Sequence, residues 1–402
     1  MTFLIAILGL ALLVFIHELG HFGAARLVHM RPRRFYIGFP PALVKVRRKG
    51  IEYGIGAIPL GGYVKIPGMH RPAPSDVDVH LGRAMEEAPE LVSPAERVKR
   101  LLDQGEIADA RHAVPGLDVT VRRAELSPVA RRSAQRGLQE LEDGLGDDAY
   151  WRAPPWKRIF VIFAGPGMNL LFAIVLFASL YMVSGGDATR TVSTVLDSRP
   201  AATAGLRPGD EIVAIDGIFV TAPDIPNVIN DSKGRRINVI VYRNGKLVDL
   251  RPVRPTKEAG TYRLGFILEG RDLGAPQAAW RSLQLTGLVT KEIGKSMSRL
   301  VTGSGRKEIS SPVGIVRGSS TALEEGVVRY LWVLGLISLS LALLNLLPLL
   351  PLDGGHIAFS IVEGIRGRSV GREIYERVSA IGIAVVLLLF FVGLSNDLGG
   401  RG

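Results

Sequence analysis

The sequence predicts a polytopic α-helical membrane protein that carries a β-hairpin at the membrane surface and one β-rich domain outside the membrane. Three observations predict it. Four apolar segments, at residues 2–20, 159–183, 331–347 and 379–394, are each about as long as a helix that crosses a bilayer. Basic residues gather beside these segments, and short β-type runs with turn signals lie between the second and the third. Hydrophobic residues make up 47% of the chain and charged residues 22%, which fits apolar spans that alternate with polar modules.

The composition narrows the classes of partner and cofactor. The 402 residues include no cysteine, which excludes disulfides and thiolate metal ligands, so any metal must be held by histidine and carboxylate. The formal net charge of +11 fits cytoplasmic loops that face anionic lipid. No nucleic-acid-binding motif is present, and we expect no nucleic acid partner. The first residues lack a basic stretch and a cleavage site, which favours a retained span over a signal peptide.

Residues 1–28 are predicted to form the first transmembrane helix, which carries the motif H-E-L-G-H at its end. The run that ends just before the last histidine is about 19 residues, or about 28 Å of helix. The spacing of four places His17 and His21 on one face, one turn apart, where two imidazoles can bind one Zn²⁺. Glu18 between them can serve as a general base. Histidines on helices are often only core or surface residues, but ionisable groups at this depth are costly and functional by default.

The distribution of basic residues predicts the orientation. No basic residue precedes the motif, whereas eight follow within a short stretch, namely Arg26, Arg31, Arg33, Arg34, Lys45, Arg47, Arg48 and Lys49. The positive-inside rule then places the N-terminus outside and the histidine end of the helix near the cytoplasm.

Residues 29–70 are predicted to form a membrane-associated β-hairpin. Two extended segments flank a polar turn at residues 47–50, and the second runs into the sequence P-L-G-G-Y-V-K at residues 59–65. One interpretation is an amphipathic ribbon that rests on the membrane interface. The other is an open strand edge beside the metal, which offers backbone hydrogen bonds to an extended peptide.

Residues 71–153 are charged and alanine-rich, and we expect a cytoplasmic insertion of amphipathic or solvated helices without chemistry of its own. His80 and His112 lie in it without a partner at ligand spacing, and we interpret both as surface residues.

Residues 154–186 contain the second predicted transmembrane helix, after an interfacial tryptophan and two basic residues. Gly165-Pro166-Gly167 in this span permits close helix packing. Asn169 needs a hydrogen-bonding partner there, and we interpret it as a packing residue.

Residues 187–256 have the character of a soluble domain and lie outside by topology. Short β-rich runs alternate with turns, and the stretch RPAATAGLRPGDEIVAIDG at residues 199–217 closely resembles the core of bacterial PDZ domains. Such domains bind peptide C-termini or extended segments by strand addition.

The last third of the chain is expected to contain an amphipathic helical region at residues 257–330 and the third transmembrane helix at 331–356. The latter ends in a segment with two prolines next to a carboxylate, and irregular backbone at that depth is tolerated only where protein or a cavity surrounds it. Residues 357–402 are predicted to form a cytoplasmic loop and the fourth transmembrane helix. Four spans place both termini outside.

Three motifs in order resemble those of the site-2 protease family, whose members are zinc metalloproteases that cut inside the membrane. They are H-E-L-G-H at residues 17–21, P-L-G-G-Y-V-K in the following loop, and N-x-x-P followed by L-D-G-G-H at residues 345–356. The order of segments is most similar to the bacterial regulator-of-sigma-E protease branch, and the likeness covers the chain except residues 71–150. The family pattern G-F-G-P reads G-F-P-P at residues 38–41, and one PDZ domain is legible where close relatives often have two.

The resemblance implies a role for each matching residue. His17, His21 and Asp353 would be zinc ligands and Glu18 the general base. Residues that would face the substrate are Gly61, Gly62, Tyr63 and Asn345. His356, beside the aspartate, is left as a structural residue or one that supports a ligand.

The expected function is hydrolysis of a peptide bond in the transmembrane segment of single-span membrane proteins, that is, regulated intramembrane proteolysis in the bacterial inner membrane. By analogy the substrate would be an anti-sigma factor or a remnant signal peptide. One alternative is a non-catalytic membrane adaptor that recruits proteins through its PDZ domain, although all four zinc-site residues are retained. The other is a transporter, but four spans are few and no inverted repeat is visible.

Overall fold

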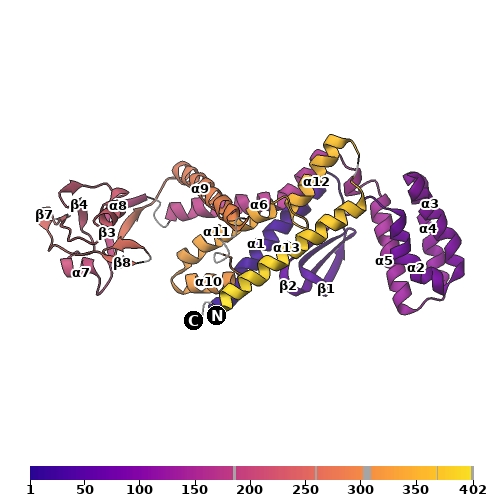
Figure 1. Ribbon diagram of the computed structural model, residues 1–402, viewed down its shortest axis with the longest axis horizontal. Helices are drawn as coiled ribbons and strands as arrows, with labels where there is room; N and C mark the ends of the chain where they lie inside the picture. The colour runs from indigo at the N-terminus through magenta and orange to yellow at the C-terminus, as the bar shows by residue number, and fades with distance from the viewer. Residues whose placement is uncertain (184–186, 259, 302–308, 369, 400–402) are drawn as a thin grey trace. The chain divides into compact units, whose positions relative to one another are not determined.

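The computed structural model describes residues 1–183, 187–258, 260–301, 309–368 and 370–399 (Figure 1). The chain forms two compact units. The first comprises Met1–Ala173 and Val289–Gly402, and the second comprises Ile174–Leu288.

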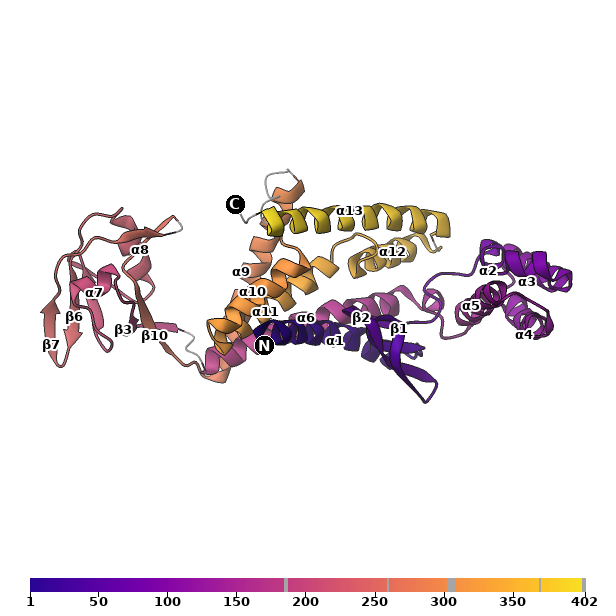
Figure 2. The same cartoon turned by 90° about the horizontal axis from the view of Figure 1, so that it is seen from below.

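Four described helices are long and apolar enough to cross a membrane, which confirms the expected number of spans. No more than 33% of the most apolar window of each is buried inside the structure, so lipid has to cover the remainder. Their bounds are α1 Thr2–Leu27, α6 Pro155–Val183, α11 Val327–Asn345 and α13 Arg372–Gly399. Figures 1 and 2 show α1 and α6 side by side.

The third span ends earlier than the sequence predicted. Helix α11 ends at Asn345, because Pro348 and Pro351 lack the N–H groups that a continuing helix needs. A separate helix, α12 (Asp353–Arg366), follows and begins at the aspartate of the L-D-G motif. The segment expected as a loop after residue 356 is therefore largely helical.

The hairpin consists of β1 (Arg34–Arg48) and β2 (Ile51–Lys65), as the sequence predicted. The start of β1 pairs twice, because residues 34–37 lie opposite residues 52–55 and also opposite residues 62–65. The segment 62–65 therefore forms an edge of the sheet, and among the described strands none pairs with its other side.

The insertion after the hairpin is a bundle of four helices with its own apolar core. They are α2 Pro74–Glu87, α3 Val92–Gln104, α4 Ile107–Arg123 and α5 Pro128–Leu145, with short 3₁₀ turns at Pro89–Leu91 and Tyr150–Arg152. His112 is exposed and His80 lies 3.0 Å from the Glu140 carboxylate on the bundle surface, as expected of surface residues.

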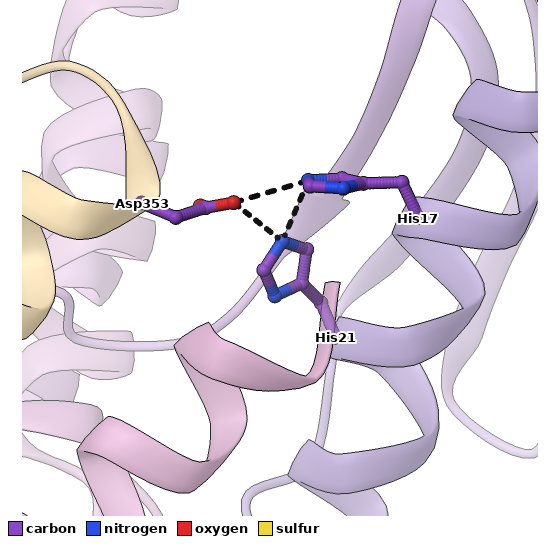
Figure 3. A group of neighbouring side chains, drawn as sticks. All are labelled: His17, His21 and Asp353. Atoms are coloured by element: carbon purple, nitrogen blue, oxygen red, sulfur yellow. Dashed lines mark hydrogen bonds and ion pairs between the residues drawn. The ribbon is translucent and has the colours of Figure 1, made fainter. Parts of the chain in front are cut away.

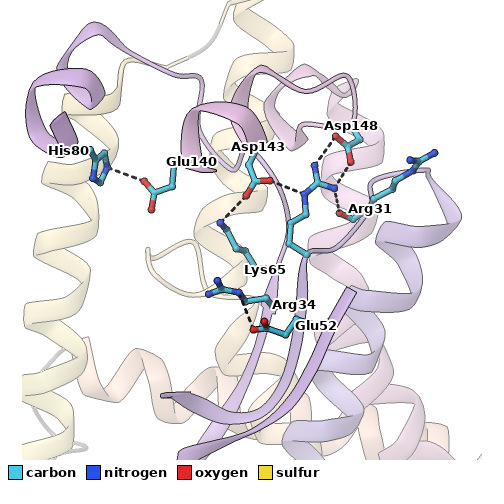
Figure 4. Close-up of polar contacts among 9 residues, drawn as sticks. Arg31, Arg34, Glu52, Lys65, His80, Glu140, Asp143 and Asp148 are labelled. Atoms are coloured by element: carbon cyan, nitrogen blue, oxygen red, sulfur yellow. Dashed lines mark hydrogen bonds and ion pairs between the residues drawn. The ribbon is translucent and has the colours of Figure 1, made fainter. Parts of the chain in front are cut away.

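Ion pairs attach this bundle to the hairpin (Figure 4). Asp143 of α5 accepts from Arg33 at 2.8 Å and lies 2.8 Å from the Lys65 ammonium at the end of β2. Asp148 adds a second carboxylate, 2.9 Å from Arg33. Asp143 is only 6% exposed, so these pairs are shielded from solvent.

The second unit contains a mixed α/β domain. Its sheet has the order β10-β3-β4-β6-β7, with β5 paired to β4 and two short helices beside it. The elements are β3 Asp187–Val195, α7 Pro200–Ala204, β4 Glu211–Ile215, β5 Ile218–Phe219, α8 Asp224–Asp231, β6 Val239–Arg243, β7 Lys246–Asp249, β8 Thr256–Glu258, β9 Thr261–Arg263 and β10 Phe266–Arg271.

This domain extends beyond the boundary that we expected at residue 256. Strand β10 pairs with β3, and Leu264, Phe266 and Leu268 pack against the same apolar core. The expected amphipathic helical region accordingly begins later, with α9 (Ala275–Val301), and continues in α10 (Pro312–Glu324).

Candidate metal centre

Two histidines of α1 and one aspartate of α12 converge at one point (Figure 3). The Nε2 atoms of His17 and His21 lie 3.1 Å apart, as their spacing of one helical turn allows. Asp353 Oδ2 lies 3.1 Å from His17 Nε2 and 3.4 Å from His21 Nε2. Both histidines are less than 9% exposed. Among the described residues, this is the group of histidine, aspartate and glutamate side chains that could hold a metal ion.

The donor set fits a tetrahedral metal ion. Asp353 Oδ2 is buried and, among the described residues, has no hydrogen bond of acceptable geometry, although two ring nitrogens are close to it. Ligand atoms placed 2.0–2.1 Å from a tetrahedral zinc ion are about 3.3 Å from one another. The three observed separations of 3.1, 3.1 and 3.4 Å match that spacing. Two imidazoles and one carboxylate also leave a fourth position for water or substrate, as a catalytic site requires.

Helix α6 holds His21 in place. The Val161 carbonyl oxygen lies 2.9 Å from His21 Nδ1, and because a carbonyl only accepts, Nδ1 carries the proton and Nε2 is free to bind a metal. The imidazole lies over Gly165, where a Cβ atom would be 2.2 Å from His21 Nε2. Gly20 of α1 faces the same helix, since a Cβ atom there would be 2.2 Å from the Ala164 carbonyl oxygen. The close packing expected of the glycine-rich segment is thus found at the metal site.

Glu18 lies against the edge strand of the hairpin. A Cβ atom on Gly62 would be 2.3 Å from Glu18 Cγ, so only glycine leaves room for the carboxylate side chain. The backbone amide of Val64 faces the Glu18 carboxylate. The general base that the sequence indicates and the strand expected to face a substrate are therefore direct neighbours.

The other expected site residues lie in β2 and at the end of α11. Gly61 and Tyr63 lie in the same edge strand as Gly62, with Tyr63 opposite Tyr36. Asn345 is the last residue of α11, and within the described part of the chain its side chain makes no hydrogen bond.

Two polar residues near the centre have partners that sequence reasoning did not assign. His356 Nδ1 lies 2.5 Å from the Tyr375 hydroxyl, which ties α12 to α13 and fits the structural role expected for His356. Asn169 of α6 is fully buried, and its side-chain amide lies 3.5 Å from His17 Nδ1. Its partner is thus the first histidine of the motif. The sequence held a signal for such a contact, because a buried amide in an apolar span is costly unless it is hydrogen-bonded.

Comparison with known proteins places this chain among metalloproteases. The model of peptidase family M50 matches residues 5–389. The regulator of sigma-W protease RasP of Bacillus subtilis is 29% identical to this chain over 96% of the chain and 95% of its own length. The zinc metalloprotease RasP of Geobacillus kaustophilus is 28% identical over 96% of the chain and 95% of its own length. A protein of Agrobacterium fabrum is 30% identical over 98% of the chain and 94% of its own length.

Proposed function

Since this chain belongs to peptidase family M50, the site-2 proteases, and is a zinc metalloprotease of membranes, we propose that it hydrolyses a peptide bond within the transmembrane segment of single-span membrane proteins. Membership of the family confirms the expected enzyme class and the zinc cofactor. The observation that carries the proposal is the convergence of three ligand atoms among helices that are apolar enough to span a membrane. A cleavage site placed among such helices fits a substrate that is itself a transmembrane segment.

We assign His17, His21 and Asp353 to zinc binding and Glu18 to general base catalysis. Bound zinc supplies Lewis-acid chemistry, which activates water and polarises a carbonyl group. Glu18 accepts the proton of the attacking water and delivers it to the leaving amine. The Val64 amide and Gly62 hold the Glu18 carboxylate beside the three ligands. Val161 fixes the ring of His21 through its carbonyl oxygen.

The hairpin edge is proposed to hold the substrate in an extended form. A transmembrane helix conceals its carbonyl groups in backbone hydrogen bonds, and opening them in lipid costs several kcal/mol for each unpaired group. The free edge at residues 62–65 can replace these bonds by strand pairing. Alternate residues of a strand direct their backbone groups to the same edge. Because the Val64 amide faces Glu18, Gly62 is the position that we expect to pair with substrate.

The domain at residues 187–271 is proposed to be a PDZ domain that lies outside the cell membrane and binds peptide segments. Strand β10 forms one edge of its sheet, where a peptide could be added. The printed name of RasP, a regulator of sigma-W protease, makes an anti-sigma factor one candidate substrate, and a remnant signal peptide is another. Titration of a labelled peptide against the full-length protein and against a variant without residues 187–271 tests this role. Equal binding to both would refute it.

We also propose that both termini lie outside and that the metal centre lies near the cytoplasmic face. The basic residues that follow α1 support this orientation. Accessibility of a tag at either terminus in intact cells tests it, and a tag protected until lysis would reverse the assignment.

The deciding experiment replaces Glu18 by glutamine. The three ligands remain, so the purified Glu18→Gln protein should bind one equivalent of zinc and fail to cleave. In cells it should cause single-span fragments to accumulate, detected by membrane proteomics against the native protein. His17→Ala is the matched control and should lose zinc together with activity. Cleavage by Glu18→Gln would refute the role of the base. A native protein that binds zinc but cleaves no membrane protein would instead favour the adaptor alternative.

A further inference from the structure

We propose that Asn169 is a positioning residue that fixes the ring proton of His17 on Nδ1 and thereby presents Nε2 to the metal. The inference rests on the proposed zinc site. Asn169 lies on α6, is 0% exposed, and places its side-chain amide 3.5 Å from His17 Nδ1. No other described side chain is hydrogen-bonded to that ring nitrogen.

The orientation of the amide decides what it does. With the Asn169 nitrogen toward His17, Nδ1 would have to accept, and the single proton of a neutral imidazole would then occupy Nε2. In that orientation Asn169 Oδ1 is buried without any hydrogen bond. A half-turn of the amide, which exchanges two atoms that are nearly indistinguishable by shape, brings Oδ1 to the ring. His17 Nδ1–H then donates to Oδ1.

The benefit of this orientation lies at the metal-binding atom. The Asn169 oxygen gains a donor, and the amide nitrogen takes the place in which the oxygen had no partner. The lone pair of His17 Nε2 becomes free at the atom that lies 3.1 Å from Asp353 Oδ2. Metal-bound histidines commonly donate their second ring N–H in this way to a fixed acceptor.

Helix α6 would then orient both histidines by the same principle. The carbonyl oxygen of Val161 accepts from His21, and the side-chain oxygen of Asn169 accepts from His17. Asn169 is itself held in place, because Ser338 of α11 donates to its backbone oxygen at 2.9 Å. Both Nε2 atoms are thereby directed at the metal position before a metal arrives.

The test compares three substitutions in the full-length protein, purified in detergent, with Zn²⁺ affinity measured by competition with a chelator. Asn169→Leu keeps the approximate size but removes the acceptor, and should weaken Zn²⁺ binding about 10- to 100-fold. Asn169→Asp keeps an acceptor in either orientation, and should bind Zn²⁺ within about threefold of the native protein. Gly167→Ala adds a methyl group on the same helix that would meet only the Phe163 ring, and should leave the affinity unchanged. The absorption spectrum of the Co²⁺-loaded protein should change in Asn169→Leu and be restored in Asn169→Asp.

A packing role predicts the opposite order, because a buried carboxylate in an apolar span is harder to accommodate than leucine. Native Zn²⁺ affinity in Asn169→Leu, or weaker binding by Asn169→Asp than by Asn169→Leu, would overturn the proposal. If leucine prevents folding, Asn169→Ala takes its place in the test, and the same loss of Zn²⁺ affinity is expected. His17→Ala in the same titration distinguishes a failure of the zinc site from a failure of the role of Asn169. Unchanged affinity in His17→Ala would refute the zinc site itself. Loss of affinity in His17→Ala with none in Asn169→Leu would refute only the role of Asn169.

Discussion

Replacing Gly165 by alanine should disable the metal centre through a single methyl group. The new Cβ atom would lie 2.2 Å from His21 Nε2 and 2.5 Å from Cε1. Ordinary carbon contacts require about 3.5 Å, so the imidazole must move by about 1 Å. Metal ligands tolerate deviations of only about 0.2 Å. We therefore expect Zn²⁺ affinity to fall at least about 100-fold, equivalent to about 2.7 kcal/mol.

The same substitution should not weaken the helix. Alanine is favoured over glycine inside a helix by up to about 1 kcal/mol, so a loss of zinc could not be blamed on poorer helix formation. Gly167, two residues further along α6, provides a matched control. A Cβ atom there would meet only the Phe163 ring, at 3.2 Å, and a small movement of that side chain relieves the contact. Gly167→Ala should bind zinc and cleave much as the native protein does.

The assay is chelator competition on the purified proteins, paired with cleavage of a single-span model substrate in membranes. Zinc affinity and cleavage of Gly165→Ala within about threefold of the native values would refute the packing of His21 over α6. Equal losses in both glycine variants would point instead to a general defect of the helix.

Two further results are expected. Gly62→Ala places a Cβ atom 2.3 Å from Glu18 Cγ and should reduce cleavage at least about tenfold while zinc stays bound, since no ligand is disturbed; loss of zinc in this variant would contradict that separation. The second result concerns Asp210 in the second unit. Burial raises the pKa of this carboxyl group, but hydrogen bonds from Arg243, at 2.6 Å, and from the Arg207 amide outweigh burial and hold the pKa below its usual value. The stability from this group is present above about pH 4 and is lost as the pH falls through the lowered pKa, so Arg243→Met should destabilise the domain by about 2 kcal/mol at pH 7 and by less in acid. Thermal unfolding at both pH values measures this, and a deficit that does not shrink in acid would exclude the ion pair as its cause.

Sequence reasoning succeeded where the information is local. The spans could be predicted because hydropathy is summed over neighbouring residues, and the pairing of His17 with His21 could be predicted because helical periodicity alone brings them to one face. The resemblance added Asp353, although the aspartate begins a separate helix and does not lie within the third span. The hairpin was predicted, but the order in which its segments pair was not. The double pairing of residues 34–37 depends on how a long strand folds back on itself.

Only the tertiary structure decided which segments that are remote in the chain contact one another. Asn169 was interpreted as a packing residue, since nothing in residues 154–186 reveals that His17 lies beside it. The boundary of the second domain was placed too early, because the pairing of β10 with β3 joins strands some 70 residues apart in a register that no local pattern encodes. A glycine such as Gly165 looks the same in the sequence whether a helix or an imidazole ring packs against it. Periodicity and hydropathy determine which elements form, whereas the identity of the side chain that fills each gap depends on the packing of all of them together.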